Sequence, residues 1–250
     1  MSQLRKLLLL GAILLSGANL VATTVSAEET TPPAQSAAPA PQQTPAPSAA
    51  APGASAPAAT AEEAPPLNVD VADLMAPGKL PEIIMGDDKA PVTIVEYHSM
   101  TCPHCSHFAK TVLPTLEDKY IKTGKVRLVL RAFPLNQLDA VAFLLLRCRP
   151  TDAYVANVKY MYDTQQAWAY SDHPKEAVMA MAQKIGFTQE TFETCLKDDA
   201  IWDGLREVAK KADETFKVDG TPAFFINGTR QASMSTVDDM EKALVPFIKN

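Results

Sequence analysis

The sequence predicts an α/β domain with a helical insertion. Two strand-like apolar runs, an amphipathic helix and a third strand-like run come first, and about eighty residues with a helical period follow. A β-hairpin and one more helix complete the expected order. Apolar residues make up 47% of the 250 residues and charged residues 21%, which excludes a collagen, a coiled-coil rod and a small disulfide-dense scaffold. The net charge of −6 argues against a nucleic-acid binder, which carries a basic patch.

The first quarter of the chain is predicted to be a targeting signal and a linker. Residues 1–27 have a basic start, an apolar stretch over 7–15 and a small-residue cleavage site at Val25-Ser26-Ala27, as a secretory signal peptide does. The alternative is an uncleaved membrane anchor, because apolar character continues weakly beyond that stretch. Residues 28–66 have alanine or proline at 24 of 39 positions and no aromatic residue, so we expect a disordered spacer. The folded domain is expected over residues 67–250.

Three strands and one long helix form the first half of the predicted domain. Strands are expected at residues 80–85, 92–98 and 126–133. The run at 92–98 is almost continuously apolar, which is typical of a strand covered on both faces. A helix is expected over residues 103–122, with a kink at Pro114 because proline disrupts a helix interior.

The second half is predicted to be mainly helical. Apolar residues with a helical period indicate a block of helices inserted at about residues 135–212. The turn pair Asn227-Gly228 then indicates a hairpin over residues 223–232, and a last helix is expected over 237–249. The helices between the third strand and the hairpin are expected at residues 138–148, 154–162, 174–185, 188–197 and 201–216.

The strongest chemical signal is Cys102-Pro103-His104-Cys105, which lies between a buried strand and a helix. Pro103 suits the first helical position, so Cys102 is expected at the N-cap, where its sulfur faces free backbone N–H groups and the positive end of the helix dipole. Cys105 lies one turn further on, is expected to be less exposed, and is placed to attack a disulfide on Cys102. A haem attachment site is excluded, because it needs a histidine where this chain has Ser106.

The residues between the cysteines bear on the direction of the redox reaction. A helix terminus contributes roughly 0.3–1 kcal/mol, and one pKa unit corresponds to about 1.4 kcal/mol. The dipole alone therefore lowers the pKa of a thiol by about one unit. Hydrogen bonds from turn N–H groups and the charge or donor of His104 are needed for a larger shift. Because a stabilised Cys102 thiolate stabilises the reduced protein, the Pro-His pair predicts an oxidising disulfide.

A structural zinc site is the alternative interpretation of the cysteine pair. Such sites need a second Cys/His pair at a downstream spacing, and Cys148 and Cys195 are single and far apart. We therefore expect no metal. The ligands of such a zinc site would come from Cys102, Cys105, His98, His104 and His107.

A second signal is the run Gly220-Thr221-Pro222-Ala223-Phe224-Phe225-Ile226-Asn227-Gly228, in which a proline precedes a strand. Together with the cysteine pair at a strand–helix turn, it resembles the thioredoxin superfamily, in which a cis-proline loop packs beside the active-site disulfide. Within that superfamily the chain resembles the DsbA-type periplasmic thiol:disulfide oxidoreductases. They share an acidic residue six positions before the first cysteine, here Glu96, and a helical block before the proline hairpin. Over roughly residues 80–250, the resemblance implies a thioredoxin-like fold with an inserted helical subdomain.

The resemblance implies a role for each of these residues. Cys102 would be the nucleophile, Cys105 the resolving thiol, and Thr221-Pro222 the loop whose backbone pairs with the substrate. Glu96 would be a buried carboxylate beneath the active site that accepts protons or tunes a pKa. The alternative for Glu96 is an ordinary strand residue in a salt bridge, with Arg131 as a candidate partner.

The same resemblance implies partners, cofactors and a location. Substrates would be unfolded or reduced secreted proteins, and a membrane quinone-linked protein would reoxidise the enzyme. The redox-active disulfide needs no metal or organic cofactor. We expect a monomer in the periplasm, either free or tethered to the membrane. The chain departs from the family at Thr221, where valine is common, and at residues 98–101, where the archetype is rich in aromatic residues; both bear on the redox potential.

The two remaining cysteines, Cys148 and Cys195, lie on apolar helix faces in the insertion. If Cys102 and Cys105 form the active disulfide, Cys148 and Cys195 are left as a second pair, which closes a loop of about 48 residues. Such a bond lowers the entropy of the unfolded chain and thereby stabilises the folded protein by about 4 kcal/mol. A second disulfide here also resembles the alphaproteobacterial branch of the family. The alternative is two buried free thiols.

Two other functions remain as alternatives. A disulfide isomerase or reductase could use the same fold, but envelope isomerases usually need a dimerisation domain, for which residues 28–79 leave little room. A metal-binding module, such as a copper chaperone, would use Cys102, Cys105 and nearby His or Met side chains. Metal content after purification would distinguish this module from an oxidoreductase.

Overall fold

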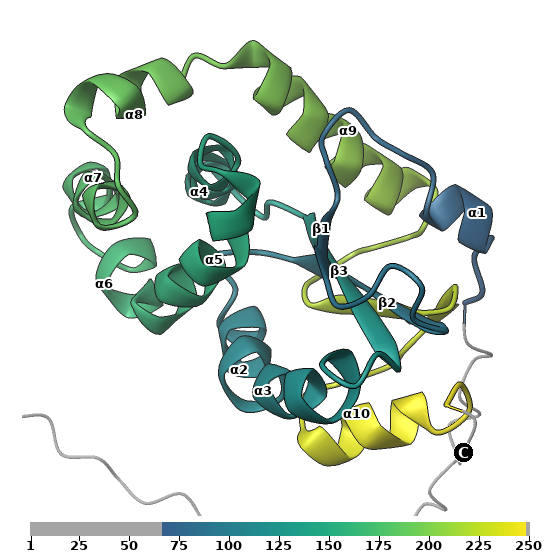
Figure 1. Ribbon diagram of the computed structural model, residues 1–250. Coiled ribbons are helices and arrows are strands. Elements are labelled where there is room, and N and C mark those ends of the chain that lie inside the picture. The colour runs from purple at the N-terminus through teal and green to yellow at the C-terminus, as the bar shows by residue number, and fades with distance from the viewer. Residues whose placement is uncertain (1–66, 249–250) are drawn as a thin grey trace, which may run out of the picture. The chain divides into compact units, whose positions relative to one another are not determined.

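The computed structural model describes residues 67–248, so the predicted signal peptide and spacer lie outside the described residues. At its centre is a five-stranded sheet with the order β1-β3-β2-β4-β5 (Figure 1). β2 and β3 run parallel, whereas the other neighbouring strands are antiparallel. The strands are β1 (Ile83–Met85), β2 (Val92–His98), β3 (Val126–Ala132), β4 (Ala223–Ile226) and β5 (Thr229–Arg230).

The helix that follows β2 is broken near the predicted proline kink. α2 (Pro103–Thr111) is followed by α3 (Leu113–Leu116) and by a π-helical turn at Glu117–Ile121. Val112 separates α2 from α3, two residues before Pro114, as the helix-breaking effect of proline predicts. The other helices are α1 (Val71–Leu74), α4 (Gln137–Arg147), α5 (Tyr154–Asp163), α6 (Gln165–Ala169), α7 (Pro174–Lys184), α8 (Gln189–Cys195), α9 (Asp199–Glu214) and α10 (Val237–Leu244), with a 3-10 turn at Thr151–Ala153.

Each face of the sheet has its own apolar core, because successive side chains of a strand point to opposite faces. All seven residues of β2 are buried. Ile94 belongs to the larger cluster, which includes side chains of α2, α10 and the helical block. Val95 and Tyr97 belong to the smaller cluster, which includes α1 and the end of α9. The continuous apolar run of β2 is therefore a strand covered on both faces, as predicted.

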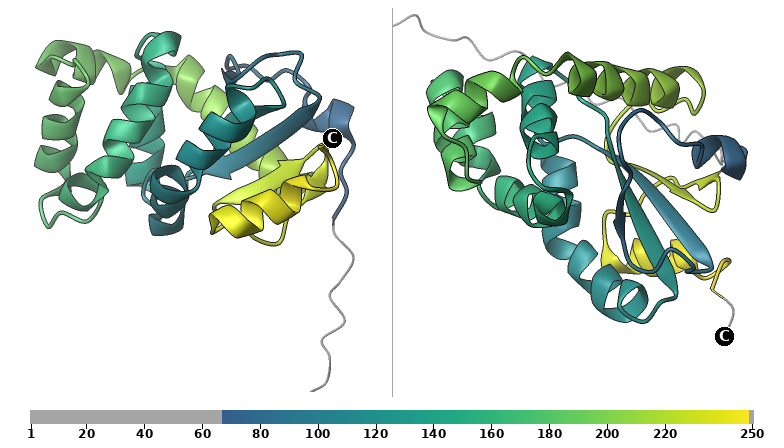
Figure 2. Two further views of the ribbon diagram at one scale, coloured as in Figure 1. Left: turned by 60° about the horizontal axis from the view of Figure 1, so that its bottom comes forward. Right: turned by 45° about the horizontal axis from the view of Figure 1, so that its top comes forward.

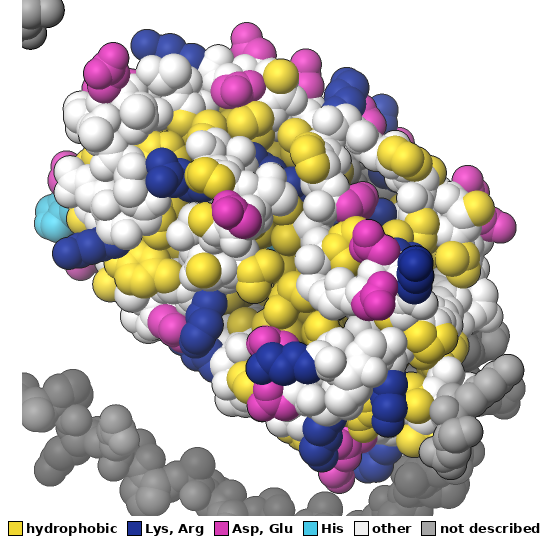
Figure 3. All heavy atoms as spheres, in the orientation of Figure 1, with side chains coloured by type: hydrophobic (Ala, Val, Ile, Leu, Met, Phe, Trp, Pro, Cys, Tyr) yellow, Lys and Arg dark blue, Asp and Glu magenta, His cyan; other side chains and the backbone are white. Residues whose placement is uncertain are grey.

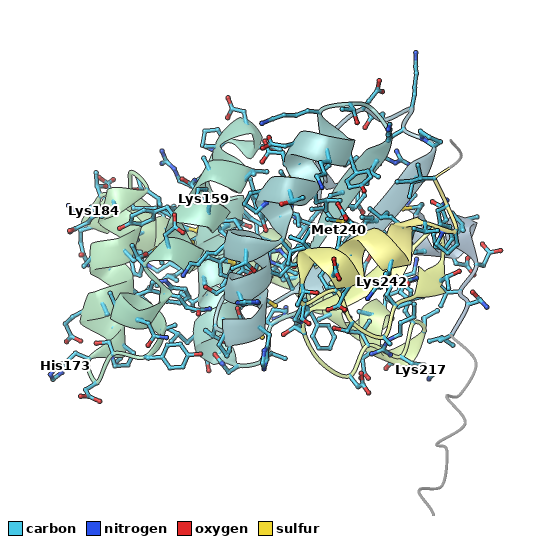
Figure 4. The ribbon with its side chains drawn as sticks, turned by 90° about the horizontal axis from the view of Figure 1, so that it is seen from below. Lys159, His173, Lys184, Lys217, Met240 and Lys242 are labelled. Atoms are coloured by element: carbon cyan, nitrogen blue, oxygen red, sulfur yellow. A yellow bond between two sulfur atoms is a disulfide. The ribbon has the colours of Figure 1, made fainter. Side chains whose placement is uncertain are left out.

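Some of the helices cover the sheet, and the others form a separate block beside it (Figures 1 and 2). α2, α3 and α10 lie over one face of the sheet, and α1 and α9 lie over the other. On α10, Met240 is buried in the core, whereas Lys242 is exposed (Figure 4). Helices α4 to α8 form the block beside the sheet. The predicted insertion over residues 135–212 also included most of α9, which lies over the sheet instead. The redox motif lies at the start of α2, between this block and the sheet.

The predicted order of elements is confirmed, with differences at four elements. α10 ends at Leu244 rather than at residue 249. β1 begins at Ile83 rather than at residue 80, and Pro81 cannot donate to a sheet ladder. Leu80 instead packs against α9 at Gly204, where a Cβ atom would lie 2.4 Å from the leucine Cγ. The helices α1 and α6 were not predicted, because four and five residues are too few to produce a helical period.

The surface carries charges of both signs. Lysine and arginine side chains alternate with acidic ones over the face seen in Figure 3, so this face has no patch of a single sign. None of the helices within residues 67–248 is both long and apolar enough to cross a membrane.

Candidate active site

Cys102 lies at the junction between the sheet and α2. β2 ends at His98, and the next four residues lead to α2, whose N-cap is Cys102 and whose first residue is Pro103. Cys102 has an extended backbone (φ −78°, ψ 124°), so its side chain lies beside the first turn of the helix. Cys105, in that first turn, is fully buried, while Cys102 is 5% exposed. Both are free thiols in the structure.

The two thiols differ sharply in acidity. The pKa of Cys102 is lowered to about 5 by groups that can donate hydrogen bonds to its thiolate form, against the opposing effect of burial. The largest contribution comes from the Cys105 thiol, followed by the Thr221 side chain and the backbone N–H groups of Cys105 and His104. Burial raises the pKa of Cys105 well above its ordinary value, and the hydrogen bond to Cys102 and the charge of Glu96 add to this effect. At neutral pH the outer sulfur is therefore a thiolate and the inner one a thiol.

His104 acts on Cys102 through its backbone. Its imidazole is exposed, and the group that lowers the pKa of Cys102 is the His104 N–H at the helix N-terminus. The sequence suggested that turn N–H groups and the His104 side chain would both stabilise the Cys102 thiolate. The structure places the His104 backbone N–H, rather than its imidazole, at the sulfur.

The loop before β4 completes the surroundings of Cys102. The Thr221–Pro222 peptide bond is cis. In its protonated form, the Cys102 thiol donates a hydrogen bond to the Thr221 carbonyl oxygen, with Sγ and O 3.2 Å apart. The Thr221 hydroxyl is buried and has no hydrogen-bond partner among the described residues. Once Cys102 has lost its proton, its sulfur can only accept, so the hydroxyl can turn to donate to the thiolate and lower the pKa of Cys102.

Glu96 lies in the middle of β2 on the face that α2 covers. It is opposite Leu130 of β3 and Phe224 of β4, and it is only 3% exposed. Burial, and to a smaller extent the charge of Cys102, raises its pKa to about 8, so the carboxyl is neutral at pH 7. No hydrogen bond or ion pair of this carboxyl is found within residues 67–248.

The suggested pairing of Glu96 with Arg131 is wrong. Arg131 is opposite Tyr97 in the parallel register and therefore points to the other face of the sheet. There it pairs with Glu82, at 3.0 Å between Nη2 and Oε1, and donates to the Tyr97 hydroxyl at 3.1 Å. The side-chain alternation of β2 thus separates the two groups.

His98 is a buried neutral histidine rather than an open ligand. Its Nδ1 is 2.8 Å from the Tyr162 hydroxyl, which itself donates to the Ser99 carbonyl oxygen. Nδ1 therefore carries the proton, and Nε2 has no partner among the described residues. Burial, followed by the charge of Arg147, lowers the pKa of His98 to about 3. Within the described range, no group of three or more His, Cys, Asp or Glu side chains is arranged to hold a metal ion.

Sequence reasoning missed the polar side chains of the helical block that contact the active-site loop. Asp139 of α4 is fully buried, and its carboxylate accepts hydrogen bonds from Met100 N at 2.7 Å and Leu135 N at 2.9 Å. Gln165 of α6 donates to backbone oxygens of the same loop. Asp139 could have been recognised from the sequence, because it is the one acidic residue in the otherwise largely apolar α4. Gln165 has no comparable signal, because it lies in a helix too short to show a pattern.

Cys148 and Cys195 form a disulfide within the helical block. Cys148 directly follows α4 and Cys195 is the last residue of α8, with the two Cα atoms 6.0 Å apart. The disulfide therefore joins the end of α4 to the end of α8, and its two cysteines are 47 positions apart in the sequence.

Comparisons with known proteins agree with this fold. The thioredoxin family profile matches residues 79–245. A putative protein-disulfide oxidoreductase of Rickettsia typhi is 32% identical over 164 residues, which are 65% of this chain and 60% of that protein. The probable disulfide bond formation protein D of Bacillus anthracis is 29% identical over 173 residues, 66% of this chain and 77% of that protein. The alignment thus spans about three fifths of the rickettsial relative.

Solved structures show the same likeness. The crystal structure of Wolbachia pipientis alpha-DsbA1 superposes with a TM-score of 0.63 and 26% identity, covering 72% of this chain and 96% of that chain. BdbD from Bacillus subtilis, at 17% identity and a TM-score of 0.55, shares the fold. The chain belongs to the thioredoxin family. Within that family it is of the DsbA type, with a helical block and a second disulfide.

Proposed function

We propose that this protein is a thiol:disulfide oxidoreductase that works as a dithiol oxidase and donates a Cys102–Cys105 disulfide to reduced polypeptides. The observation that carries the proposal is the pair of thiols with opposite acidity, the outer with a pKa of about 5 and the inner with a raised pKa. Such a pair reacts at one defined sulfur. Cys102 is the more accessible of the two and is attacked first, and its low pKa makes it the better leaving thiolate when the mixed disulfide is resolved.

The proposed reaction has two exchange steps. A substrate thiolate attacks Cys102 Sγ of the disulfide, a bond forms between the two sulfurs, and the bond to Cys105 breaks. Cys105 leaves as a thiolate and takes up a proton. A second substrate thiolate then attacks the substrate sulfur of this mixed disulfide and releases the Cys102 thiolate. The substrate loses two electrons and two protons, and the electrons reside on the two enzyme sulfurs.

The acidity of Cys102 favours the oxidising direction. At pH 7 a thiol with a pKa of about 5 rather than 9.0 stabilises the reduced enzyme by about 3 kcal/mol. For a two-electron couple this corresponds to a reduction potential higher by about 60 mV. Cys105 is protonated at pH 7 with either its ordinary or its raised pKa, so it adds nothing to this difference in reduction potential.

Two further groups take part in the proposed reaction. In the mixed disulfide, Cys102 has no proton to donate, so the Thr221 carbonyl oxygen is free to accept an N–H of the substrate backbone. Glu96, neutral at pH 7 beneath the cysteines, can give a proton to Cys105 as it leaves and take one back on reoxidation. Thr221, whose peptide bond to Pro222 is cis, contacts Cys102, and Pro103 is the first residue of α2.

The proposed setting is the periplasm, with reduced secreted proteins as substrates and a membrane quinone-linked protein as the oxidant that regenerates the disulfide. The names of the relatives, a protein-disulfide oxidoreductase and a disulfide bond formation protein, support the reaction class. The alanine- and proline-rich composition of residues 28–66 suits a spacer between a membrane and the domain.

A redox titration tests the direction. The full chain is equilibrated with glutathione buffers, alkylated and mapped by mass spectrometry. For an oxidase, Cys102 and Cys105 become reduced in mildly reducing buffers, while Cys148 and Cys195 stay oxidised. A Cys102–Cys105 bond that persists into strongly reducing buffers would identify a reductase instead, and scrambled-substrate refolding would reveal an isomerase. The Cys102→Ser variant is the control, because it cannot form the mixed disulfide.

A further inference from the structure

The short segment between β2 and α2 is held by hydrogen bonds from the helical block. Residues 99–102 belong neither to the sheet nor to the interior of the helix, so their backbone groups need other partners. Four of these partners are side chains of the block. The Met100 N–H donates to Asp139, the Ser99 carbonyl accepts from Tyr162, the Thr101 carbonyl accepts from Tyr170, and the Met100 and Cys102 carbonyls both accept from Gln165.

Gln165 differs from the other three because one amide group contacts the backbone at two points, one of them on the nucleophile. Its Nε2 is 2.8 Å from Met100 O and 3.0 Å from Cys102 O. An amide nitrogen has two hydrogens, so each carbonyl receives one. The side chain is 3% exposed, so water does not replace these bonds readily.

The Cys102 carbonyl links this contact to the first turn of α2. It also accepts the Ser106 N–H at 3.2 Å, the bond that starts the helix. The stabilisation of the Cys102 sulfur depends on its place beside the N–H groups of His104 and Cys105 in the same turn. A change in the orientation of the Cys102 peptide moves the sulfur relative to these donors and to the Thr221 carbonyl oxygen.

We propose that Gln165 is a positioning residue for the nucleophile: by bridging the carbonyls of Met100 and Cys102, it holds the Cys102 sulfur over the N-terminal turn of α2. This inference rests on the proposed function, in which Cys102 is the reacting sulfur. It gives the helical block a part in the reaction, since a residue 63 positions further along the chain sets the geometry of the N-cap. Gln165 does not touch the reacting atoms.

The test measures the acidity of Cys102 directly. In the reduced full chain, the rate of iodoacetamide alkylation is followed against pH, and peptide mapping assigns it to Cys102. Gln165→Met keeps the length of the side chain and removes both donors. We expect it to raise the apparent pKa of Cys102 by about one unit, which makes alkylation below the pKa roughly tenfold slower. Val178→Ala in α7, a buried residue of the same block, is the control for lost stability.

A second variant separates positioning from packing. In Gln165→Glu, the protonated acid can donate to one carbonyl, whereas the carboxylate repels both. Cys102 in this variant should therefore resemble the original protein in acid and depart from it as the new carboxyl ionises. Gln165→Glu also serves as the test if Gln165→Met does not fold.

One result would overturn the inference: both Gln165 variants lower the melting temperature, as Val178→Ala does, but leave the titration of Cys102 unchanged. The measurement does not depend on which way electrons flow. A protein that proves to be a reductase would therefore contradict the proposed function and leave the positioning role of Gln165 standing.

Discussion

Replacing Glu96 by glutamine is expected to stabilise the folded protein at neutral pH. The carboxyl is 3% exposed, and burial together with the Cys102 charge raises its pKa from 4.5 to about 8. In the unfolded chain the same group is ionised and hydrated at pH 7. Folding must therefore bind a proton and desolvate the acid, which opposes folding.

The magnitude follows from the two pKa values. Between pH 4.5 and about 8 the folded state binds more protons than the unfolded state, so this group makes stability fall as pH rises. At pH 7 the loss is about 3 kcal/mol, and near pH 4.5 it is close to zero. Glutamine has nearly the same shape and does not titrate. The Glu96→Gln variant should therefore be more stable by about 3 kcal/mol at pH 7 and nearly unchanged at pH 4.5.

Urea unfolding of the reduced chain at pH 4.5, 6 and 7 measures this difference. Glu82→Gln is the matched control, because it removes the partner of the buried Arg131 on the other face of the sheet. That variant should be less stable by about 1–3 kcal/mol. A Glu96→Gln variant that is destabilised at pH 7, or whose gain does not change between pH 4.5 and 7, would refute the reasoning.

Three further predictions concern the loop, the disulfide and α9. Thr221→Val removes the buried hydroxyl that can donate to the thiolate, so the pKa of Cys102 should rise by about one unit, as measured by the pH dependence of alkylation. Replacing Cys148 and Cys195 together by alanine opens a loop with a separation of 47 and should cost about 4 kcal/mol in urea unfolding, while the redox titration of the active pair stays the same. Gly204→Ala places a Cβ 2.4 Å from a leucine side chain and should cost about 1–3 kcal/mol; an unchanged melting temperature would contradict this packing.

Local patterns were sufficient for most of the fold. The apolar run of β2 predicted a strand with the observed bounds, and Pro114 predicted the break after α2. The turn pair Asn227-Gly228 predicted the β4–β5 hairpin, in which both residues have positive φ values. Each of these features depends on residues close together in the chain, so the sequence displays its cause directly.

Tertiary structure was needed wherever two strands or two subdomains meet. Glu96 and Arg131 were plausible partners in the sequence, but the parallel register of β2 and β3 sends them to opposite faces. Tyr162 and Gln165 are 63 and 65 positions away from the loop residues they bind. Nothing near them in the sequence marks these contacts.

The sequence by itself determined the elements, the chemistry of the cysteine pair and the place of Cys102 at a helix N-terminus, because these follow from short-range backbone preferences and residue type. Only the tertiary structure decided how acidic each thiol is, that Arg131 lies on the opposite face from Glu96, and which side chains hold the loop. Burial and hydrogen bonding control those properties, and both depend on neighbours that the chain brings together only when it folds.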